Sequence, residues 1–304
     1  MTVLSDETRL PQAYWNNAAA TYEEEFVDTL LGKLWREAVW NEIDAGFRSG
    51  ERILEINCGT GIDALHLASK GISVVACDIS SRMIEMARRR AADASLASLV
   101  DFHVLPTEEL PRLEAEGLFD GVLSNFSGLN CVKDLSLVRR ELAKRLKPGS
   151  LAYICMLGRF VPWEILWFLG RGDLKRAFHK LYRSSFQSSK GEIEVQLPSR
   201  KQVVQLFEPD FQLRSWKGIG IALPPAYADP WAKHFPKLMR GLSRIDQLVG
   251  RVPVLRSSGG CILFEFERAT YQRNCDAVSS TISKVRETDS LRTMGHEPTI
   301  SLCT

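Results

Sequence analysis

A tight glycine turn follows the apolar run Arg52–Ile56, and its residue types favour a cofactor site. Gly59 and Gly61 stand just after this strand-like run, and an apolar-periodic helix follows them. Glycines let a backbone come close to a ligand. The next apolar run, Val74–Cys77, ends in the acid Asp78. Because a carboxylate at the tip of a neighbouring strand can accept hydrogen bonds from ribose hydroxyls, the pattern predicts a nucleotide-type cofactor site.

Strand-like and helix-like segments alternate around this turn and must position it. Strands are expected at 52–56, 73–77, 100–105, 119–124 and 151–157. Between them, apolar residues recur with helical spacing at 62–70, 81–92 and 134–146. Gly71 is expected to end the first of these helices, and Pro148-Gly149 to break the last. Such alternation predicts a parallel sheet covered by helices on both faces.

The second half of the chain has a different rhythm. We expect a strand entering a helix over 195–207, with Ser199 as the helix cap, and two further strands at 211–221 and 260–268. The polar end of the chain shows no sustained period. The predicted organisation is a helical cap at 1–50, a cofactor-binding core at 51–157, the rest of the sheet with helical insertions at 158–269, and a flexible tail at 270–304.

The bulk composition is that of an ordinary globular protein. The 304 residues are 45% apolar and 25% charged, and the net charge of +2 gives no electrostatic reason to expect nucleic acid. No apolar run reaches the roughly 18 residues of a membrane helix, and the polar N-terminus lacks a secretion signal. The 7 cysteines form no CxxC pair and no cluster with histidine. We therefore expect reduced core cysteines, no metal site and a cytoplasmic location.

Four motifs in order resemble the class I S-adenosylmethionine (SAM)-dependent methyltransferases. Residues 55–61, Glu-Ile-Asn-Cys-Gly-Thr-Gly, resemble the first glycine motif of that family, and 78–83 look like its second motif. Phe119–Val122 resembles the start of its fourth strand, and 141–149 the helix and turn before its fifth. The N-terminal segment 14–22 is similar to the opening of the small-molecule branch, the methyltransferase type 11/25-like proteins, which includes ubiquinone- and menaquinone-type enzymes.

This resemblance implies an α/β fold with SAM as the cofactor. The fold would be a Rossmann-like, doubly wound seven-stranded sheet, mostly parallel with an antiparallel last strand, plus helical lid insertions. Asp78 would accept from both ribose hydroxyls, and Ile79 and Met83 would enclose the adenine. Tyr22 would close over the cofactor. The full cofactor set that the resemblance implies is Tyr22, Glu55, Asn57, Cys58, Gly59, Gly61, Asp78, Ile79, Met83, Thr107, Glu108, Asn125 and Phe126.

Two positions depart from the family pattern. Asn57 stands where the family has its first motif glycine, and asparagine tolerates positive φ better than most residues. Pro106 stands in place of the aspartate that often holds the adenine amino group. Either Thr107 or Glu108 substitutes for that aspartate, or the affinity for the cofactor is reduced. These departures keep open a second hypothesis, a methyltransferase-like binding or scaffold protein without turnover.

Other chemistries of related sites fit the sequence poorly. A dinucleotide site needs a third glycine, but positions 57, 62 and 64 are not glycine. No Gly-Lys-Ser or Gly-Lys-Thr follows a glycine run, as a phosphate-binding Walker loop requires. After the fourth strand stands Asn125-Phe126-Ser127-Gly128 and not the Asn-Pro-Pro-Tyr type of signature, which argues against N-methylation of adenine, cytosine or glutamine.

The acceptor is expected to be a small molecule, methylated in line while water is excluded. Two stretches rich in Trp, Phe, Leu and Pro, 158–198 and 222–258, are the expected lids, and we interpret them as walls of an apolar or aromatic acceptor pocket. A sharper hypothesis is peripheral membrane contact, with Phe160–Leu169 and the basic helix after it resting on a membrane surface. The chain is expected to be a monomer or a homodimer.

No catalytic base is named from the sequence. Methyl transfer from a sulfonium needs a general base only where the acceptor holds its proton tightly. Each candidate in the variable segments has a packing or surface role as its default interpretation. These candidates are His179, His234, Tyr182 and Tyr227.

Overall fold

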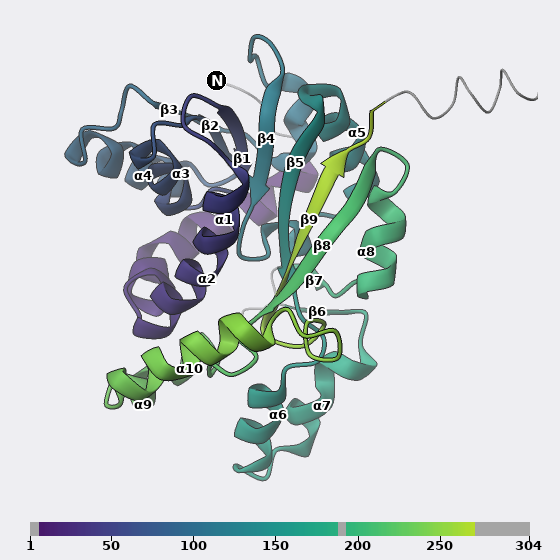
Figure 1. The fold of residues 1–304 in the computed structure, drawn as a ribbon. Helices are drawn as coiled ribbons and strands as arrows, with labels where there is room; N and C mark the ends of the chain where they lie inside the picture. The colour runs from purple at the N-terminus through teal and green to yellow at the C-terminus, as the bar shows by residue number, and fades with distance from the viewer. Residues whose placement is uncertain (1–5, 188–192, 271–304) are drawn as a thin grey trace, which may run out of the picture. The chain divides into compact units, whose positions relative to one another are not determined.

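The computed structural model describes residues 6–187 and 193–270 of the 304-residue chain. One compact unit ends at Arg268 and contains every helix and strand named below. The predicted flexible tail lies outside the described residues from 271 onward. Figure 1 shows a central sheet in this unit with helices on either side of it.

A seven-stranded sheet has the strand order β3-β2-β1-β4-β5-β9-β8. Strands β1 to β5 pair in parallel, and β9 runs antiparallel to both of its neighbours, β5 and β8. The predicted Rossmann-like fold with an antiparallel last strand is therefore confirmed. The strands are β1 (Arg52–Ile56), β2 (Ser73–Asp78), β3 (Val100–Val104), β4 (Phe119–Ser124), β5 (Leu146–Leu157), β8 (Phe211–Ile219) and β9 (Cys261–Arg268).

Side chains alternate along each strand and so supply a hydrophobic core on each face of the sheet. Ile53 belongs to one core and its neighbour Leu54 to the other. Figure 1 shows the two helix layers on opposite sides of the strands. The first face is covered by α2 (Leu30–Gly46), α3 (Ile62–Ser69) and α4 (Ser81–Asp93). The second face is covered by α5 (Leu135–Arg145) and α8 (Arg200–Phe207).

The helices begin where the sequence supplies capping side chains. Ser80, Asp134 and Ser199 each accept a hydrogen bond from a backbone N–H in the first turn of α4, α5 and α8, respectively. Such caps satisfy N–H groups that have no partner within the helix. The predicted starts of these three helices are confirmed.

The fifth strand is longer than predicted. It begins at Leu146, five residues before the expected start at Leu151, because Leu146 already pairs with Phe119. The register between β4 and β5 then shifts, as at a bulge. Pro148 and Gly149 lie inside the strand at this irregularity, with Gly149 at φ +81°. Interpreting this pair as a simple turn between helix and strand was therefore wrong.

The remaining elements are further helices and turns and a second, two-stranded sheet. The strand predicted near 195 pairs with β6 in a separate two-stranded sheet and not with the main sheet. Among the described residues, no helix combines the length and apolar character needed to cross a bilayer. These elements are α1 (Asp6–Tyr22), the π-helical turn η1 (Glu23–Val27), η2 (Thr107–Arg112), η3 (Gly128–Cys131), α6 (Pro162–Leu169), α7 (Leu174–Tyr182), β6 (Ser185–Gln187), β7 (Glu194–Gln196), η4 (Ala226–Ala228), α9 (Asp229–Ala232) and α10 (Pro236–Val249).

Candidate functional site

Asp78 ends β2 and lies directly against the glycine loop that follows β1. The backbone N–H of Gly59 donates to Oδ2 of Asp78 at 2.9 Å, and that of Ser80 donates to Oδ1 at 2.8 Å. Burial raises the pKa of Asp78, and these two backbone hydrogen bonds partly oppose the rise. An ionised carboxylate has about four acceptor positions. The two backbone hydrogen bonds occupy two of them.

The loop after β1 depends on glycine at two positions for different reasons. Gly59 (φ +56°) lies under two side chains: a Cβ built on it would be 3.6 Å from Sδ of Met83 and 3.9 Å from Cε1 of Tyr22. Gly61 (φ +74°) begins α3, and a Cβ there would come within 2.8 Å of the Ala87 Cβ. Gly59 thus exposes backbone below Tyr22 and Met83, while Gly61 lets α3 start close to α4.

Asn57 keeps the left-handed conformation that the family glycine would have. Its φ is +58°, its Nδ2 donates to Oγ1 of Thr107 at 2.8 Å, and its Oδ1 accepts from Oγ of Ser124 at 3.3 Å. A Cβ on Gly128 would lie 2.3 Å from the Cβ of Asn57, so the glycine at 128 makes room for this side chain. The expectation that asparagine sustains this turn is confirmed. The side chain also ties the loop to η2 and to the end of β4.

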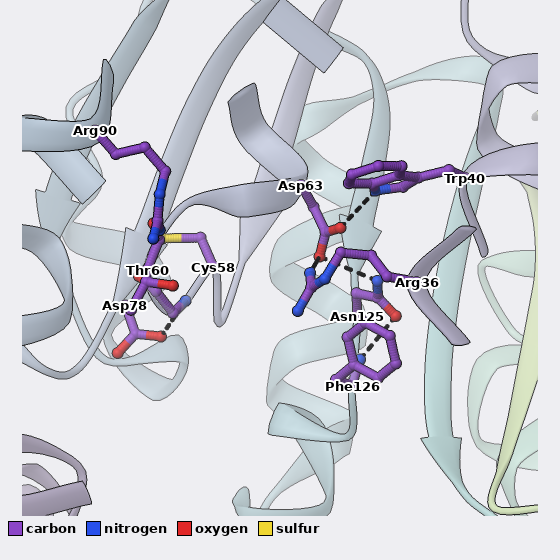
Figure 2. A network of polar contacts seen from close by, with 10 residues as sticks. Arg36, Trp40, Cys58, Thr60, Asp63, Asp78, Arg90, Asn125 and Phe126 are labelled. Atoms are coloured by element: carbon purple, nitrogen blue, oxygen red, sulfur yellow. Dashed lines mark hydrogen bonds and ion pairs between the residues drawn. The ribbon is translucent and has the colours of Figure 1, made fainter. Parts of the chain in front are cut away.

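A buried polar network joins α2, α3 and the end of β4 beside this loop (Figure 2). Oδ2 of Asp63 lies 2.5 Å from Nη1 of Arg36 and 3.0 Å from Nδ2 of Asn125, and Oδ1 accepts from Nε1 of Trp40 at 2.7 Å. The Arg36 guanidinium also lies over the Phe126 ring, at 4.6 Å from its centroid. Burial lowers the pKa of Arg36, but the attraction of Asp63 outweighs it, so the guanidinium stays charged.

Arg36 and Asp63 are absent from the predicted site, although the sequence carries a signal for both. Arg36 interrupts the apolar face of the helix 30–46, whose neighbours Trp35 and Val39 are buried. Asp63 is an acid in the first turn of an otherwise apolar helix after the glycines. Each residue therefore indicates a buried charge that needs a partner, although the sequence does not show which partner it meets.

The aromatic rings of η1 and its flank cover the loop. The Phe26 ring packs edge-on against Phe126 with centroids 4.8 Å apart, and it lies 5.8 Å from the Tyr22 ring. Burial raises the pKa of the Tyr22 hydroxyl to about 12. Tyr22 therefore stays neutral at physiological pH, and its ring lies next to Gly59. That it closes over the cofactor stays a prediction. A short π-helical turn such as η1 often marks a functional site.

Some of these residues line a partly open cavity of about 20 Å³, which has room for about one water molecule, and Asp78 is not among them. A ligand of nucleotide size does not fit into this space, and Tyr22 is one of the residues that line it. The cavity brings together residues of the predicted set and residues that it lacked. Its lining consists of Tyr22, Arg36, Asn57, Cys58, Gly59, Thr60, Ile62, Asp63, Asn125 and Phe126.

Glu55 has a buried oxygen without a hydrogen-bond partner in the described part of the chain, as does the hydroxyl of Thr60 in the same loop. The Glu55 side chain is buried in β1, and its Oε2 has no hydrogen-bond partner among the described residues. Burial raises the pKa of Glu55 well above its usual range, and the charge of Asp63 adds to the rise. A cationic group placed beside this carboxyl would satisfy the oxygen and favour its ionised form.

The other residues of the predicted set take supporting positions. Ile79 is covered by α1, whose Gln12 Nε2 donates to the Ile79 carbonyl at 3.0 Å. Glu108 is half-buried in η2, and neither it nor Ile79 lines the cavity. Burial raises the pKa of the Cys58 thiol well above its usual range, so Cys58 contributes shape and backbone but no thiolate.

None of the four candidate general bases lines the cavity. A larger groove of about 1080 Å³ lies over α6, α7 and β6, and its lining includes His179 and Tyr182. This groove shares no lining residue with the cavity at the glycine loop. Within the described part of the chain, no three His, Cys, Asp or Glu side chains gather into a set that could ligate a metal.

Comparison with known proteins finds a methyltransferase domain and methyltransferase relatives. Residues 53–149 match the family model described as a methyltransferase domain. A demethylmenaquinone methyltransferase of Beutenbergia cavernae is 31% identical over 139 residues, which are 45% of this chain and 53% of that protein. The ubiquinone/menaquinone biosynthesis C-methyltransferase UbiE of Geotalea daltonii is 28% identical over 176 residues, 55% of this chain and 72% of that protein.

The fold also matches that of solved structures. The S-adenosylmethionine dependent methyltransferase of Mesorhizobium loti superposes with a TM-score of 0.51 at 18% identity, covering 76% of this chain and 98% of that one. Residues 53–149 thus match a methyltransferase domain, and the chain has the fold of solved SAM-dependent methyltransferases. The resemblance inferred from the motifs is confirmed. The chain spans about half of the length of the Beutenbergia relative.

Proposed function

We propose that the protein is an enzyme that binds SAM over the loop 55–61 and transfers its methyl group in line to a small, apolar or aromatic acceptor. The observation that carries this proposal is the contact between Asp78 and the backbone of Gly59. It puts a carboxylate at the tip of β2, beside a loop that exposes its own backbone.

The charges around the loop fit the methionine end of SAM. Arg36 offers a buried guanidinium for the carboxylate of the cofactor, held in place by Asp63. The carboxyl of Glu55, with its unsatisfied oxygen, suits the ammonium group. Asp78 would hold the ribose hydroxyls. When bound, SAM supplies a methyl group already activated by the sulfonium charge, so the protein has to align the acceptor and exclude water.

The same residues account for the exclusion of water. Tyr22 and Phe26 already cover the loop, and Phe126 closes the side toward the end of β4. In this assignment, the cover opens to admit the cofactor and closes over it before transfer. Asn125 and Phe126 would then lie at the junction of the cofactor and the acceptor.

The acceptor class is inferred from the lids and from the relatives. Trp163 and Trp167 of α6 face inward: Nε1 of Trp163 donates to the Ala222 carbonyl at 2.6 Å, and the Trp167 ring lies 6.0 Å from that of Tyr227. The two lids thus meet through aromatic side chains, which favours an apolar or aromatic acceptor. The names of the two relatives describe methyltransferases of quinone biosynthesis, which supports an acceptor of this class.

A binding or scaffold protein without turnover is the second candidate. The observation that favours it is the size of the cavity, about 20 Å³. If the cover never opens, the loop keeps the fold of a methyltransferase without its cofactor. The two candidates therefore differ in whether SAM binds and in whether its demethylated product, S-adenosylhomocysteine, accumulates.

Calorimetric titration with SAM and with S-adenosylhomocysteine tests the proposal. Both ligands are expected to bind. Asp78→Asn should lower the affinity for each of them about 10- to 100-fold, because each hydrogen bond to a charged group contributes about 1.5–3 kcal/mol. Asp120→Asn is the matched control, since Asp120 also accepts a hydrogen bond from a backbone N–H, that of Arg52, but is the second residue of β4, at the end of the strands opposite to Asp78. Absence of heat with either ligand would refute the cofactor site. Binding without product formation on demethylated quinols and phenols would favour the scaffold.

A further inference from the structure

Large apolar side chains face solvent along α9, α10 and the turn between them. A folded protein seldom exposes several such residues in one segment without a use for them. We refer to the exposed side chains of residues 231–248 as the α10 face. Its apolar members, with their exposed fractions, are Trp231 (41%), Phe235 (47%), Leu238 (52%), Ile245 (49%) and Leu248 (74%).

The α10 face is also positively charged. Lys233, Lys237, Arg240 and Arg244 are exposed, and none of them forms an ion pair with another described residue. Asp246 is the acid of this segment, and it is fully buried. Its carboxylate accepts hydrogen bonds from the backbone of 220–222 and so does not neutralise the exposed cations.

Helical spacing separates the apolar and the cationic side chains into two stripes. The buried residues Met239, Ser243 and Asp246 fix which side of α10 faces the protein. At 3.6 residues per turn, Leu238, Ile245 and Leu248 then fall on one outward stripe. The side chains of 237, 240 and 244 form a second outward stripe next to it. This pattern is typical of a helix that lies in the interface of a membrane.

The α10 face also lies at the edge of the sheet that carries the cofactor loop. Strand β8 runs in the same direction as β1 to β5, because both it and β5 are antiparallel to β9. The α9–α10 segment leaves the end of β8, and Figure 1 shows α10 crossing below the strands near α6. A surface bound through this face would therefore lie on the side of the molecule where the parallel strands end.

We infer that the α10 face docks on an anionic lipid bilayer. The cations would meet lipid phosphates, while Trp231, Phe235 and Leu248 would enter the boundary between headgroups and acyl chains. A second copy of the chain fits less well, because a two-fold interface through this face would bring the same four cations against one another. The location differs from the membrane contact predicted at 160–169, where Trp163 and Trp167 pack inward while Phe160, Leu166 and Leu169 are exposed.

Cosedimentation of the full chain with lipid vesicles tests this inference. The protein should sediment with phosphatidylcholine vesicles that contain phosphatidylglycerol and stay in solution with phosphatidylcholine alone. Raising the salt concentration should release it, because exposed charges are screened. Arg240→Glu with Arg244→Glu should lower the partition coefficient at least 25-fold, since each lost cation contributes about fivefold. Leu238→Ser with Leu248→Ser should also weaken binding while all charges remain.

The matched control changes the same charges on the opposite helix layer. Arg140 on α5 and Lys201 on α8 are exposed, and Arg140→Glu with Lys201→Glu should lower the partition coefficient less than fivefold. Equal binding to both kinds of vesicle, no binding to either, or an equal loss in the control variant would overturn the inference. So would a concentration-dependent dimer in gel filtration that the Arg240→Glu/Arg244→Glu variant abolishes, because the face would then bind a second copy.

Discussion

The guanidinium of Arg36 and the carboxylate of Asp63 form an ion pair between α2 and α3, with Nη1 2.5 Å from Oδ2 and side chains only 7% and 5% exposed. Removing one partner of such a pair leaves the other charge buried without compensation. Asp63→Asn should therefore lower the free energy of unfolding by about 3–5 kcal/mol at neutral pH, as measured by urea denaturation.

A second ion pair on the same side of the molecule provides the control. Lys33 lies 3.6 Å from Asp28, but these side chains are 57% and 67% exposed. Asp28→Asn should change the free energy of unfolding by less than about 1 kcal/mol, because water screens exposed pairs. If the two variants lost the same stability, the pair of Arg36 and Asp63 would not be the stabilising contact described here.

A substitution of Arg36 should affect only the binding of ligands that carry the amino-acid group of the cofactor. The proposed partner of Arg36 is the carboxylate of the methionine group. Arg36→Lys should therefore weaken the binding of S-adenosylhomocysteine, because a lysine ammonium cannot form the two parallel hydrogen bonds of a guanidinium. The expected loss is about 10-fold, which corresponds to one charge-assisted hydrogen bond. Binding of methylthioadenosine, which lacks the amino-acid group, should be unchanged. An equal loss for both ligands in calorimetry would assign Arg36 a purely structural role.

Glu55 should make stability depend on pH in a direction set by its burial. Its folded pKa is raised above the ordinary value of 4.5. A carboxyl with a raised folded pKa contributes stability that is present below its unfolded pKa and is lost as the pH rises through its folded pKa. Glu55→Gln removes this loss. The stability of the variant relative to wild type should therefore increase as the pH rises above 4.5.

The measurement compares free energies of unfolding of the two proteins at a series of pH values from 4 to about 9. The difference between the two free energies is the informative quantity. Burial also raises the pKa of Asp78 and Asp246, but those groups titrate in both proteins and so cancel in the difference. Glu55→Gln should at the same time weaken the binding of SAM, because the ammonium group of SAM would lose a charged partner. A stability difference that is constant with pH would contradict the burial of an ionisable Glu55 carboxyl.

Much of the fold could be predicted from the sequence because its determinants are local. Ser80 and Asp134 cap their helices within three residues, and apolar runs mark the strands that the sheet contains. The start of β5 could not be predicted, since it depends on the pairing of Leu146 with Phe119 across the sheet. The contact of Asp78 with Gly59 was expected because neighbouring parallel strands end at one edge.

The missed part of the site has a common physical reason. Arg36 and Asp63 come from two helices that meet only in the folded chain, so no spacing in the sequence connects them. The inward orientation of Trp163 is likewise set by the Ala222 carbonyl, which is 59 residues away. Composition shows that such residues are apolar or charged, but tertiary packing decides which partner each one meets.

Substitutions of Asn57 should lower the stability of the protein to different extents, because they differ in backbone strain and in the side-chain hydrogen bonds that they remove. The φ of +58° at Asn57 suits glycine, is tolerated by asparagine and is strained by roughly 1 kcal/mol or more in alanine. Asn57→Gly loses only the hydrogen bonds to Thr107 and Ser124, while Asn57→Ala loses them and adds strain. Thermal unfolding should therefore give the order wild type, then Asn57→Gly, then Asn57→Ala. Alanine as stable as glycine would show that the turn relaxes.

Phe26 should control how fast the cofactor enters. Its ring packs edge-on against Phe126 at 4.8 Å and lies over Arg36, so opening the cover must break these contacts. An aromatic pair of this kind contributes about 0.5–1.5 kcal/mol. Phe26→Ala should therefore raise the association rate constant of S-adenosylhomocysteine about 2- to 10-fold in stopped-flow measurements. Phe160→Ala removes a ring that is 46% exposed and remote in sequence from η1, and it should leave the rate unchanged. If the rate stays the same in Phe26→Ala, the cofactor enters by a route that does not require this ring to move, and Tyr22 alone or α1 must form the gate.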